Sequence, residues 1–315
     1  MIHTVTFNPV IDLIYHVPNF QKGKTFRCKE FAMIPAGKGM NVSYALTCLE
    51  EASHTYAVIS NDRAELYRNA CEEKNIVFHP IAGHHHMRYH STLLDAHDRT
   101  VTHIQTKGDS ITPALVDELI DELLNNINAE DIVVLAGSLP PGVDPSIYAM
   151  MIDECRDKQA YVLLDTNGDA LLEGVTARPF VLKINQQEAE ELTKIKWKSD
   201  QDTLEMIEEI QEIAEIPFLM ISLGARGIVA SAKTGAWKLH VPMDETEIVD
   251  TVGCGDVLTA GFVYSLARKK PEQEIAAYAI ACASVAAKHA GPGHFQKTEI
   301  GDFWERINIQ PLQGS

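Results

Sequence analysis

The chain has 315 residues, of which 45% are hydrophobic and 23% are charged, which is the composition of an ordinary soluble globular protein. Its 27 Lys and Arg against 44 Asp and Glu give a formal net charge of −17, which argues against nucleic acid or an anionic membrane as a partner. A few local Lys and Arg residues can still form a positive pocket for a phosphorylated substrate.

The cysteines and the apolar segments indicate the compartment. The six cysteines contain no C-x-x-C pair and no zinc-ligand spacing, so we expect reduced thiols in a cytoplasmic protein. Residues 1–5 look like the start of a strand, so we expect no signal peptide. The apolar stretch 276–287 is too short to span a bilayer.

Apolar runs and turn residues predict that strands alternate with helices along most of the chain. The expected strands, in chain order, are 2–7, 55–60, 76–79, 131–136, 161–165, 180–184, 217–222, 228–232 and 236–241. The expected helices are 35–50, 63–74, 113–127, 145–158, one that contains Glu188, 201–214, 256–269 and 272–289. This alternation implies an α/β fold with a doubly wound, mostly parallel sheet, and it places sites at the carboxyl ends of the strands.

Two strand-rich insertions, 13–34 and 85–105, interrupt the alternation. Within the second, a hairpin is expected around residues 96–99. Neither insertion can bury a core alone, so we expect them to pair as a small sheet, a lid over a cleft in one domain that spans residues 1–315. The C-terminal residues 307–315 look like a trailing segment.

The stretch Thr251 to Asp256, followed by an apolar helix, has the features of a phosphoryl-transfer site. Gly253 and Gly255 allow a tight turn that presents the amides of residues 253–255 at a helix N-terminus, where an anion is favoured. Asp256 then stands where a carboxylate can take the proton of an attacking hydroxyl. The structural alternative is an Asp in a glycine-rich helix cap.

Two common nucleotide-binding motifs are excluded. Around Gly37 and Lys38 a P-loop needs Gly at Ala32 and Ser or Thr at Gly39. A dinucleotide fingerprint that starts at Gly37 or Gly253 needs its third Gly at Val42 or Leu258. An oxidoreductase of the NAD type therefore has little support.

The order of six motifs resembles the ribokinase-like sugar kinases, specifically the phosphofructokinase B branch, which includes tagatose-6-phosphate kinase and 1-phosphofructokinase. The family patterns that the sequence resembles are T-x-N-P-x-x-D at 6–12, A-G-K-G-x-N-V at 36–42, S-G-S-L-P-x-G at 136–142, K-P-N-x-x-E at 183–188, I-S-L-G-x-x-G at 221–227 and T-V-G-A-G-D at 251–256. Together they cover nearly the whole chain.

The resemblance implies a role for each motif. Asp256 would be the catalytic base, and the amides of Gly253, Cys254 and Gly255 the anion hole. Asn185 and Glu188 would organise Mg²⁺, largely through water. The ATP side would be lined by Lys183, Ser222, Gly224 and Gly227, with Asn185 beside them, and the sugar hydroxyls would be held by Asp12, Gly37, Gly39 and Asn41. The lid would exclude water on closure and form the interface of a homodimer.

The substrate's own phosphate needs cations, and the candidates are Arg88, Lys38 and Arg27. Arg27 resembles an Arg of members that act on 6-phosphates, a hint toward tagatose 6-phosphate or fructose 6-phosphate over fructose 1-phosphate. Its structural alternative is an exposed charge on an edge strand. The sequence also departs from the family pattern. His90 replaces an expected Asn, Ile184 replaces a Pro, and Cys254 either acts as a slightly larger Ala or has a lowered pKa at the helix N-terminus.

Two further features leave alternatives open. The run His84-His85-His86 suggests a metal site or a solvated turn, and the turn is favoured because successive strand residues point to opposite faces. Asp165 at a strand end could contact nucleotide or cap the following turn.

Three functions follow. The first is an ATP-dependent kinase for a ketohexose phosphate. The second is a kinase for an unphosphorylated sugar or nucleoside, and the third is a non-catalytic nucleotide-binding regulator. The exact sugar, the hydroxyl that is phosphorylated and the regulation are not given by the sequence.

Overall fold

The computed structural model describes residues 1–95, 97–98, 100–289, 291 and 293–312, and it shows an α/β fold with one large and one small sheet. The strands are β1 (Ile2–Thr6), β2 (Val10–Val17), β3 (Phe31–Ala36), β4 (Ser53–Ser60), β5 (Val77–Gly83), β6 (Arg88–Asp95), β7 (Val101–Gln105), β8 (Ile132–Ala136), β9 (Tyr161–Asp165), β10 (Val181–Asn185), β11 (Phe218–Ser222), β12 (Ile228–Ala232), β13 (Gly235–His240) and β14 (Asn308–Pro311). The helices are α1 (Lys38–Cys48), α2 (Ala64–Glu72), α3 (Pro113–Asn126), α4 (Ile147–Asp157), α5 (Gly168–Thr176), α6 (Gln186–Thr193), α7 (Asp200–Ile213), α8 (Cys254–Ala267), α9 (Glu272–Ala286) and α10 (Ile300–Glu305).

The large sheet has the order β14-β13-β12-β11-β10-β9-β8-β1-β4-β5. The pairs from β5 through β11 are parallel, and β12, β13 and β14 continue the sheet antiparallel. The chain winds outward from β1 to β5 and then returns to the other side of β1 with β8. The strand order therefore reverses between β1 and β8, and an open α/β sheet binds its ligands at such a point.

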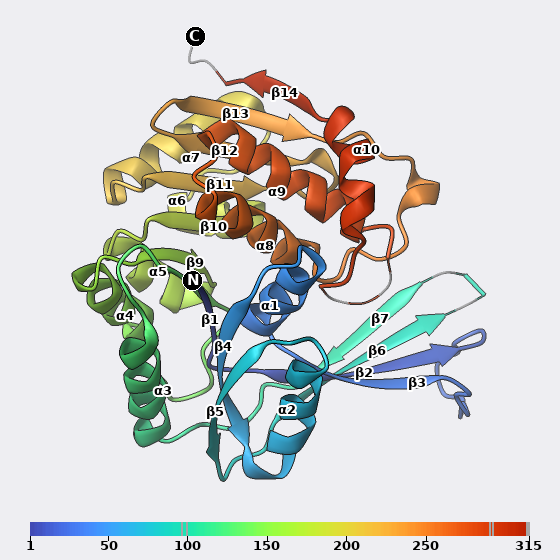
Figure 1. Cartoon of the computed structure of the whole chain (residues 1–315). Coiled ribbons are helices and arrows are strands. Elements are labelled where there is room, and N and C mark those ends of the chain that lie inside the picture. Colours follow the sequence, from blue (N-terminus) through green and yellow to red (C-terminus); the bar gives the residue numbers. More distant parts are fainter. Residues whose placement is uncertain (96, 99, 290, 292, 313–315) are drawn as a thin grey trace.

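Helices cover both faces of the large sheet, as the alternation predicted. On one face α3 to α7 bury an apolar cluster that includes Val5, Leu135, Tyr148 and Leu219. On the other face α1, α8, α9 and α10 bury a second cluster that includes Val134, Met220 and Phe262. Figure 1 shows α1, α8 and α9 in front of the large sheet. The predicted doubly wound, mostly parallel architecture is thus confirmed.

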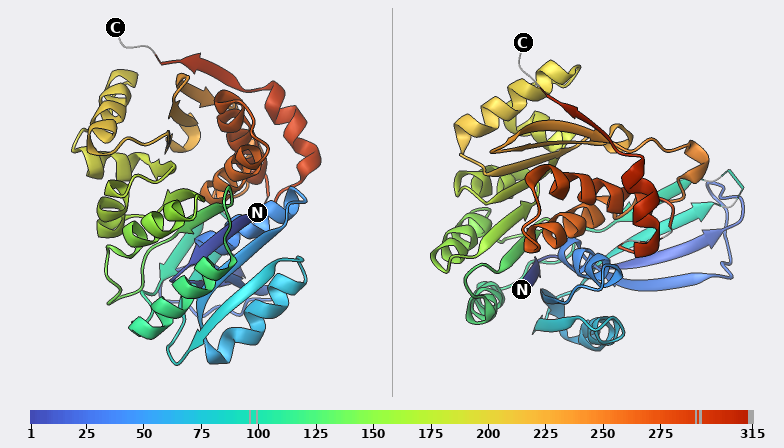
Figure 2. Two further views of the ribbon diagram at one scale, coloured as in Figure 1. Left: turned by 60° about the vertical axis from the view of Figure 1, so that its left-hand side comes forward. Right: turned by 45° about the horizontal axis from the view of Figure 1, so that its top comes forward.

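The small sheet, β3-β2-β6-β7, projects from one side of the molecule (Figures 1 and 2). Its strands come from the two predicted insertions, and β2 pairs parallel with β6 and antiparallel with β3. The strands on either side of the expected hairpin are present as β6 and β7, while residues 96 and 99 of its turn lie outside the described residues. Residues 18–30, between β2 and β3, contain no strand.

Two predictions were wrong. The C-terminal segment is not merely trailing, because β14 pairs with β13 from Trp237 to His240. Helix α5 was missed, because Gly168 and Gly174 weaken its helical pattern. Gly174 is needed there for packing, since a Cβ at this position would lie 2.7 Å from Leu164 Cδ2.

None of the helices in the described part of the chain combines the length and hydropathy of a membrane span. All six cysteines are free thiols.

Candidate functional site

The predicted anion site lies at the start of α8. Gly253 is the N-cap residue and has a φ of 80°, a left-handed conformation that favours glycine. The N–H of Cys254 donates to Thr251 O at 3.3 Å, so this amide is already engaged in the turn. A Cβ on Gly255 would lie 3.3 Å from Lys183 Nζ. The helix N-terminus and a lysine ammonium therefore meet at Gly255, and both favour an anion.

Asp256, the third residue of α8, is buried at this mouth with 6% of its surface exposed. Burial raises the pKa of Asp256 to about 6, with the charge of Asp165 adding to the rise and Lys38, Asn41 and Lys183 opposing it. A carboxylate with a pKa near 6 is ionised at neutral pH and is still basic enough to accept a proton in a transition state.

An ion-pair network joins the two sides of the site through Asp165. This carboxylate has no exposed surface, and it lies 2.6 Å from Lys38 Nζ and 3.0 Å from Lys183 Nζ. Although burial alone would raise the pKa of Asp165, the two lysines hold it below its ordinary value. Burial would lower the pKa of Lys38, yet the charges of Asp165 and Asp256 raise it above its usual range.

Sequence reasoning did not find this role of Asp165. The sequence allows either a nucleotide contact or a turn cap for Asp165. The structure shows a third arrangement, in which its carboxylate accepts hydrogen bonds from two lysines. The available signal was the end of an apolar strand. Asp165 ends β9 and Asn185 ends β10, which is its neighbour in the sheet, so polar side chains gather at one edge.

The predicted metal ligands cap a helix. Asn185 Oδ1 accepts the N–H of Glu188 at 2.9 Å, and Glu188 Oε2 accepts the N–H of Asn185 at 2.7 Å, which is a reciprocal capping box. Glu188 is 7% exposed, and burial raises its pKa. Oxygen donors suit Mg²⁺, but the described residues contain no cluster of three or more His, Cys, Asp or Glu that could hold a metal ion by itself. The residues thus fit a magnesium ion that keeps water and phosphate oxygens as its other ligands.

The residues predicted to line the ATP side lie at the carboxyl ends of β10 and β11 and in the turn after β11. Ser222 ends β11 and donates from Oγ to Ile184 O at 3.4 Å. Gly224 and Gly227 have φ values of 61° and 92°. A Cβ at Gly227 would lie 2.0 Å from Leu239 O, so close packing against β13 explains this glycine without a ligand.

The two glycines before and within the start of α1 also have a packing reason. A Cβ at Gly37 would lie 2.7 Å from Thr6 Cγ2, and one at Gly39 would lie 2.6 Å from Thr6 Oγ1 and from Val5 O. They allow α1 to begin directly against the end of β1. This close approach brings Lys38 to Asp165 and Asn41 to Asp256.

Asp12, Arg88 and His90 share one face of the small sheet, because Asp12 lies beside His90 and Val10 beside Arg88 in the pairing of β2 with β6. His90 Nδ1 lies 3.5 Å from Asp12 Oδ1. Burial raises the pKa of Asp12 to about 6, against the opposing charge of Arg88. Burial and the charge of Arg88 lower the pKa of His90 to about 4, so its ring is neutral near pH 7.

The remaining candidates are Arg27, the histidine run and Cys254. Arg27 is exposed in residues 18–30 and is therefore not on an edge strand. His84 and His85 lie in a bend and His86 follows it, shortly before β6. Among the described residues these histidines belong to no cluster that could hold a metal ion. Burial and the nearby charges of Asp250 and Asp256 raise the pKa of Cys254 to about 12, so the alternative of a lowered pKa is wrong.

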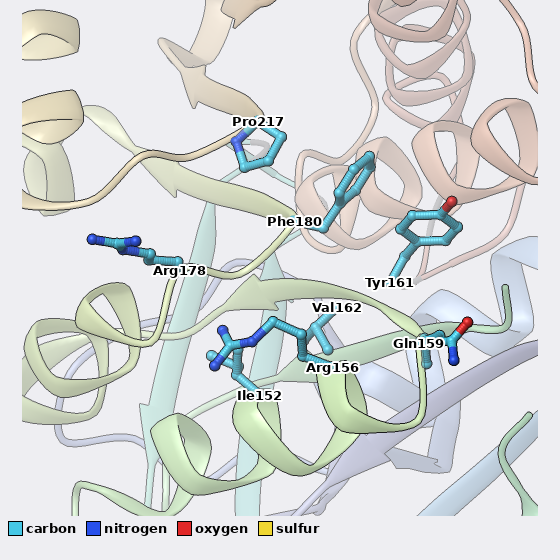
Figure 3. Close-up of a pocket in the computed structure, with 9 residues that line it drawn as sticks. Ile152, Arg156, Gln159, Tyr161, Val162, Arg178, Phe180 and Pro217 are labelled. Atoms are coloured by element: carbon cyan, nitrogen blue, oxygen red, sulfur yellow. The ribbon is translucent and has the colours of Figure 1, made fainter. Parts of the chain in front are cut away.

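A hollow of about 360 Å³ lies at the opposite end of the strands (Figure 3). Its lining includes Tyr161, Phe180 and Pro217, at or just before the starts of β9, β10 and β11, together with Arg156 of α4 and Arg178. Arg156 donates to Ala177 O at 2.7 Å, at the C-terminus of α5. Its guanidinium thus caps a helix, and the hollow contains none of the motif residues.

Comparison with known proteins agrees with the predicted family. The family model described as "pfkB family carbohydrate kinase" matches residues 4–299. The chain is 26% identical over 311 residues to 1-phosphofructokinase of Escherichia coli K12, covering 98% of each chain. It is 28% identical over 279 residues to 1-phosphofructokinase of Bacillus subtilis, covering 87% of this chain and 88% of that one.

The structure of phosphofructokinase-2 from Escherichia coli has the same fold, with a TM-score of 0.90 at 20% identity over 96% of this chain and 98% of that one. Because the family model spans nearly the whole sequence, including every motif of the site, the chain belongs to the pfkB family of carbohydrate kinases.

Proposed function

We propose that the protein transfers the γ-phosphoryl group of ATP to a hydroxyl of a ketohexose phosphate, with Asp256 as the general base. The observation that carries this proposal is the position of Asp256. It is buried in the first turn of α8, beside the glycine turn, with the ammonium groups of Lys38 and Lys183 brought to the same place by Asp165. A carboxylate beside several donors for an anion suits phosphoryl transfer, in which a base accepts the hydroxyl proton while donors stabilise the transferred group.

The proposed reaction is a single in-line displacement at the γ-phosphorus of ATP. Asp256 takes the hydroxyl proton as the sugar oxygen bonds to the γ-phosphorus, and the bond from that phosphorus to the bridging oxygen breaks to release ADP. The N-terminus of α8 and Lys183 stabilise the charge on the transferred group, with Lys38 on the sugar side. Asn185 and Glu188 would hold Mg²⁺, largely through water, and the ion would neutralise phosphate charge. Ser222, Gly224 and Gly227 would line the nucleotide side.

The small sheet supplies the substrate's side of the site in this proposal. Asp12 and Asn41 would bind hydroxyls beside the backbone of Gly37 and Gly39, and Arg88 would bind the existing phosphate, with Arg27 as a further candidate. The full-length likeness to enzymes named 1-phosphofructokinase puts fructose 1-phosphate first among the candidates. Tagatose 6-phosphate and fructose 6-phosphate remain the other two, and Arg27 would favour them.

We also propose a homodimer that forms through the small sheet, which acts as a lid. The face opposite Asp12 carries Leu13, Tyr15, Phe31 and Met33, since Leu13 pairs with Met33 and Tyr15 with Phe31. Phe31 and Met33 are 53% and 42% exposed, so this face presents apolar surface that a second copy would cover.

The deciding experiment measures ADP release with Mg-ATP against the three ketohexose phosphates, fructose, ribose and adenosine. We expect turnover of one phosphohexose and its loss by at least about 10³-fold in Asp256→Asn. Turnover of an unphosphorylated compound alone would contradict the assigned roles of Arg88 and Arg27. ATP binding without turnover of any compound would indicate a regulator.

A further inference from the structure

The base is tied to a helix far away in sequence. Asn41 Nδ2 donates to Asp256 Oδ2 at 2.7 Å, which joins α1 to α8 across 215 residues. Asn41 is 8% exposed and Asp256 is 6% exposed, so this hydrogen bond is shielded from water. The two helices pack against each other (Figure 1), and the bond joins the first turn of α1 to the first turn of α8.

Chemistry fixes the orientation of the amide. An ionised carboxylate can only accept hydrogen bonds, so the NH₂ group of Asn41 must face it. The reversed amide would place two oxygen atoms 2.7 Å apart where Asn41 Nδ2 and Asp256 Oδ2 now meet. Asp256 Oδ1 makes no hydrogen bond with another described residue and remains available to a reacting hydroxyl.

The oxygen of the same amide is buried without a partner. Among the described residues, Asn41 Oδ1 is a buried side-chain acceptor that receives no hydrogen bond. An unsatisfied buried acceptor is costly, so each one in a native structure needs an explanation, such as a catalytic role or a bound group that supplies the missing donor. This acceptor belongs to the same side chain that holds the base.

We infer that Asn41 is a positioning residue for Asp256: its NH₂ group fixes one carboxylate oxygen, so that the other faces the reacting hydroxyl, while its unpartnered oxygen accepts a second hydroxyl of the same sugar. This inference rests on the proposed function, because it needs a hydroxylated substrate at Asp256. The inference goes beyond the proposed function because it assigns the sugar contact and the positioning of the base to one side chain. A sugar that lacks the second hydroxyl would lose binding at Asn41, whereas the hydrogen bond that holds the carboxylate is already present without substrate.

The groups that face Asp256 allow the effect to be isolated. From α1 come Lys38 and Asn41, from β9 Asp165, from β10 Lys183 and from the small sheet Asp12. Asn41 is the only uncharged one of these five. Its replacement by leucine therefore removes a hydrogen bond without changing the charges around the base.

The experiment compares the pH dependence of kcat/KM in the wild type, Asn41→Leu and Asn41→Asp between pH 5 and 10. In Asn41→Leu the carboxylate loses a donor, so the midpoint of the acidic limb is expected to move up by about one to two pH units. In Asn41→Asp a like charge takes the place of the amide, and the midpoint is expected to move up further. Asn69→Leu makes the same chemical change on the exposed surface of α2 and is expected to leave the midpoint unchanged.

A second readout does not depend on turnover. The ¹³C resonance of the Asp256 carboxyl, assigned by its absence in Asp256→Asn, is titrated in the substrate-free wild type and variants. The same upward shifts are expected, and thermal unfolding shows which variants are folded; Asn41→Asp has nearly the shape of Asn and covers the case in which Asn41→Leu does not fold. Unchanged midpoints by both readouts would overturn the inference. A wild type without kinase activity would overturn the proposed function instead, and the carboxyl titration would still decide whether Asn41 holds Asp256.

Discussion

Lys183 lies 3.0 Å from Asp165, and the two residues come from adjacent parallel strands at the edge where the site lies. The side chain of Lys183 is 6% exposed and that of Asp165 is fully buried. A buried ion pair of this kind adds little net stability, but the loss of one partner leaves the other charge uncompensated.

Asp165→Asn is therefore expected to reduce both stability and activity. Loss of the carboxylate leaves two ammonium groups together, and we expect the free energy of unfolding to fall by about 3–5 kcal/mol. Urea denaturation measures this change, and Asp169→Asn, an exposed residue in the first turn of α5, is the matched control. A variant as stable as the wild type would show that Asp165 does not hold the two lysines.

The raised pKa of Asp256 predicts the acidic limb of the rate profile. The proposed base works only when deprotonated, so kcat/KM should fall about tenfold per pH unit below the pKa of about 6 and level off above it. Asp12 has a similar pKa of about 6, so the assignment needs a control. Asp12→Asn should weaken sugar binding and keep an acidic limb. A rate that stays constant down to pH 5 in the wild type would contradict Asp256 as the base.

Arg88→Ala is expected to raise KM for the phosphosugar by about 10- to 100-fold and to leave KM for ATP unchanged, because a charge-assisted contact to phosphate is lost. Arg88 is half-buried on the face of the small sheet that carries Asp12. Arg27→Ala tests the second candidate under the same assay. An effect restricted to 6-phosphates would support its predicted role, whereas equal effects of both variants on ATP would contradict phosphate recognition by either.

His90→Asn is expected to change the preference among ketohexose phosphates. The neutral imidazole lies beside Asp12, and its Nε2 is buried without a partner among the described residues. An Asn offers a donor and an acceptor on a shorter side chain, so it should reorder the kcat/KM values for the three sugars. His103→Asn, on the exposed strand β7, is the comparison. An identical order of sugars in His90→Asn and the wild type would exclude His90 from specificity.

Charge on the outer face of the small sheet tests the dimer. Phe31→Glu combined with Met33→Lys replaces two exposed apolar side chains on one face without changing the net charge. We expect the mass measured by light scattering after gel filtration to fall from that of a dimer to that of a monomer of 34.9 kDa. A wild type that is already monomeric would contradict the interface.

The fold could be predicted because its signals are local. Apolar strands such as Tyr161–Asp165 are bounded by turns, and their alternation with helices defines a parallel sheet. Helix α5 and strand β14 were not found in this way. Two glycines weaken the first, and the second is four exposed residues whose strand conformation depends on β13.

The motif residues were identified, but their contacts were not. Each glycine motif marks a close approach of the backbone, which a sequence can show. The pairing of Lys38 and Lys183 through Asp165, and of Asn41 with Asp256, depends on how α1, β9, β10 and α8 meet in space. For Asn185 and Glu188 the spacing alone cannot tell the role, because the same spacing that suggests a metal site also forms a helix cap.

Strand β14 also has a consequence for how the protein is handled. It is short, exposed and contains Pro311, so it is a poor template for further strand pairing. Shortening the chain before residue 308 would make β13 the outermost strand, with the backbone groups that now pair with β14 left open. Truncated forms are therefore expected to self-associate during purification, and affinity tags at this end should leave residues 308–311 intact.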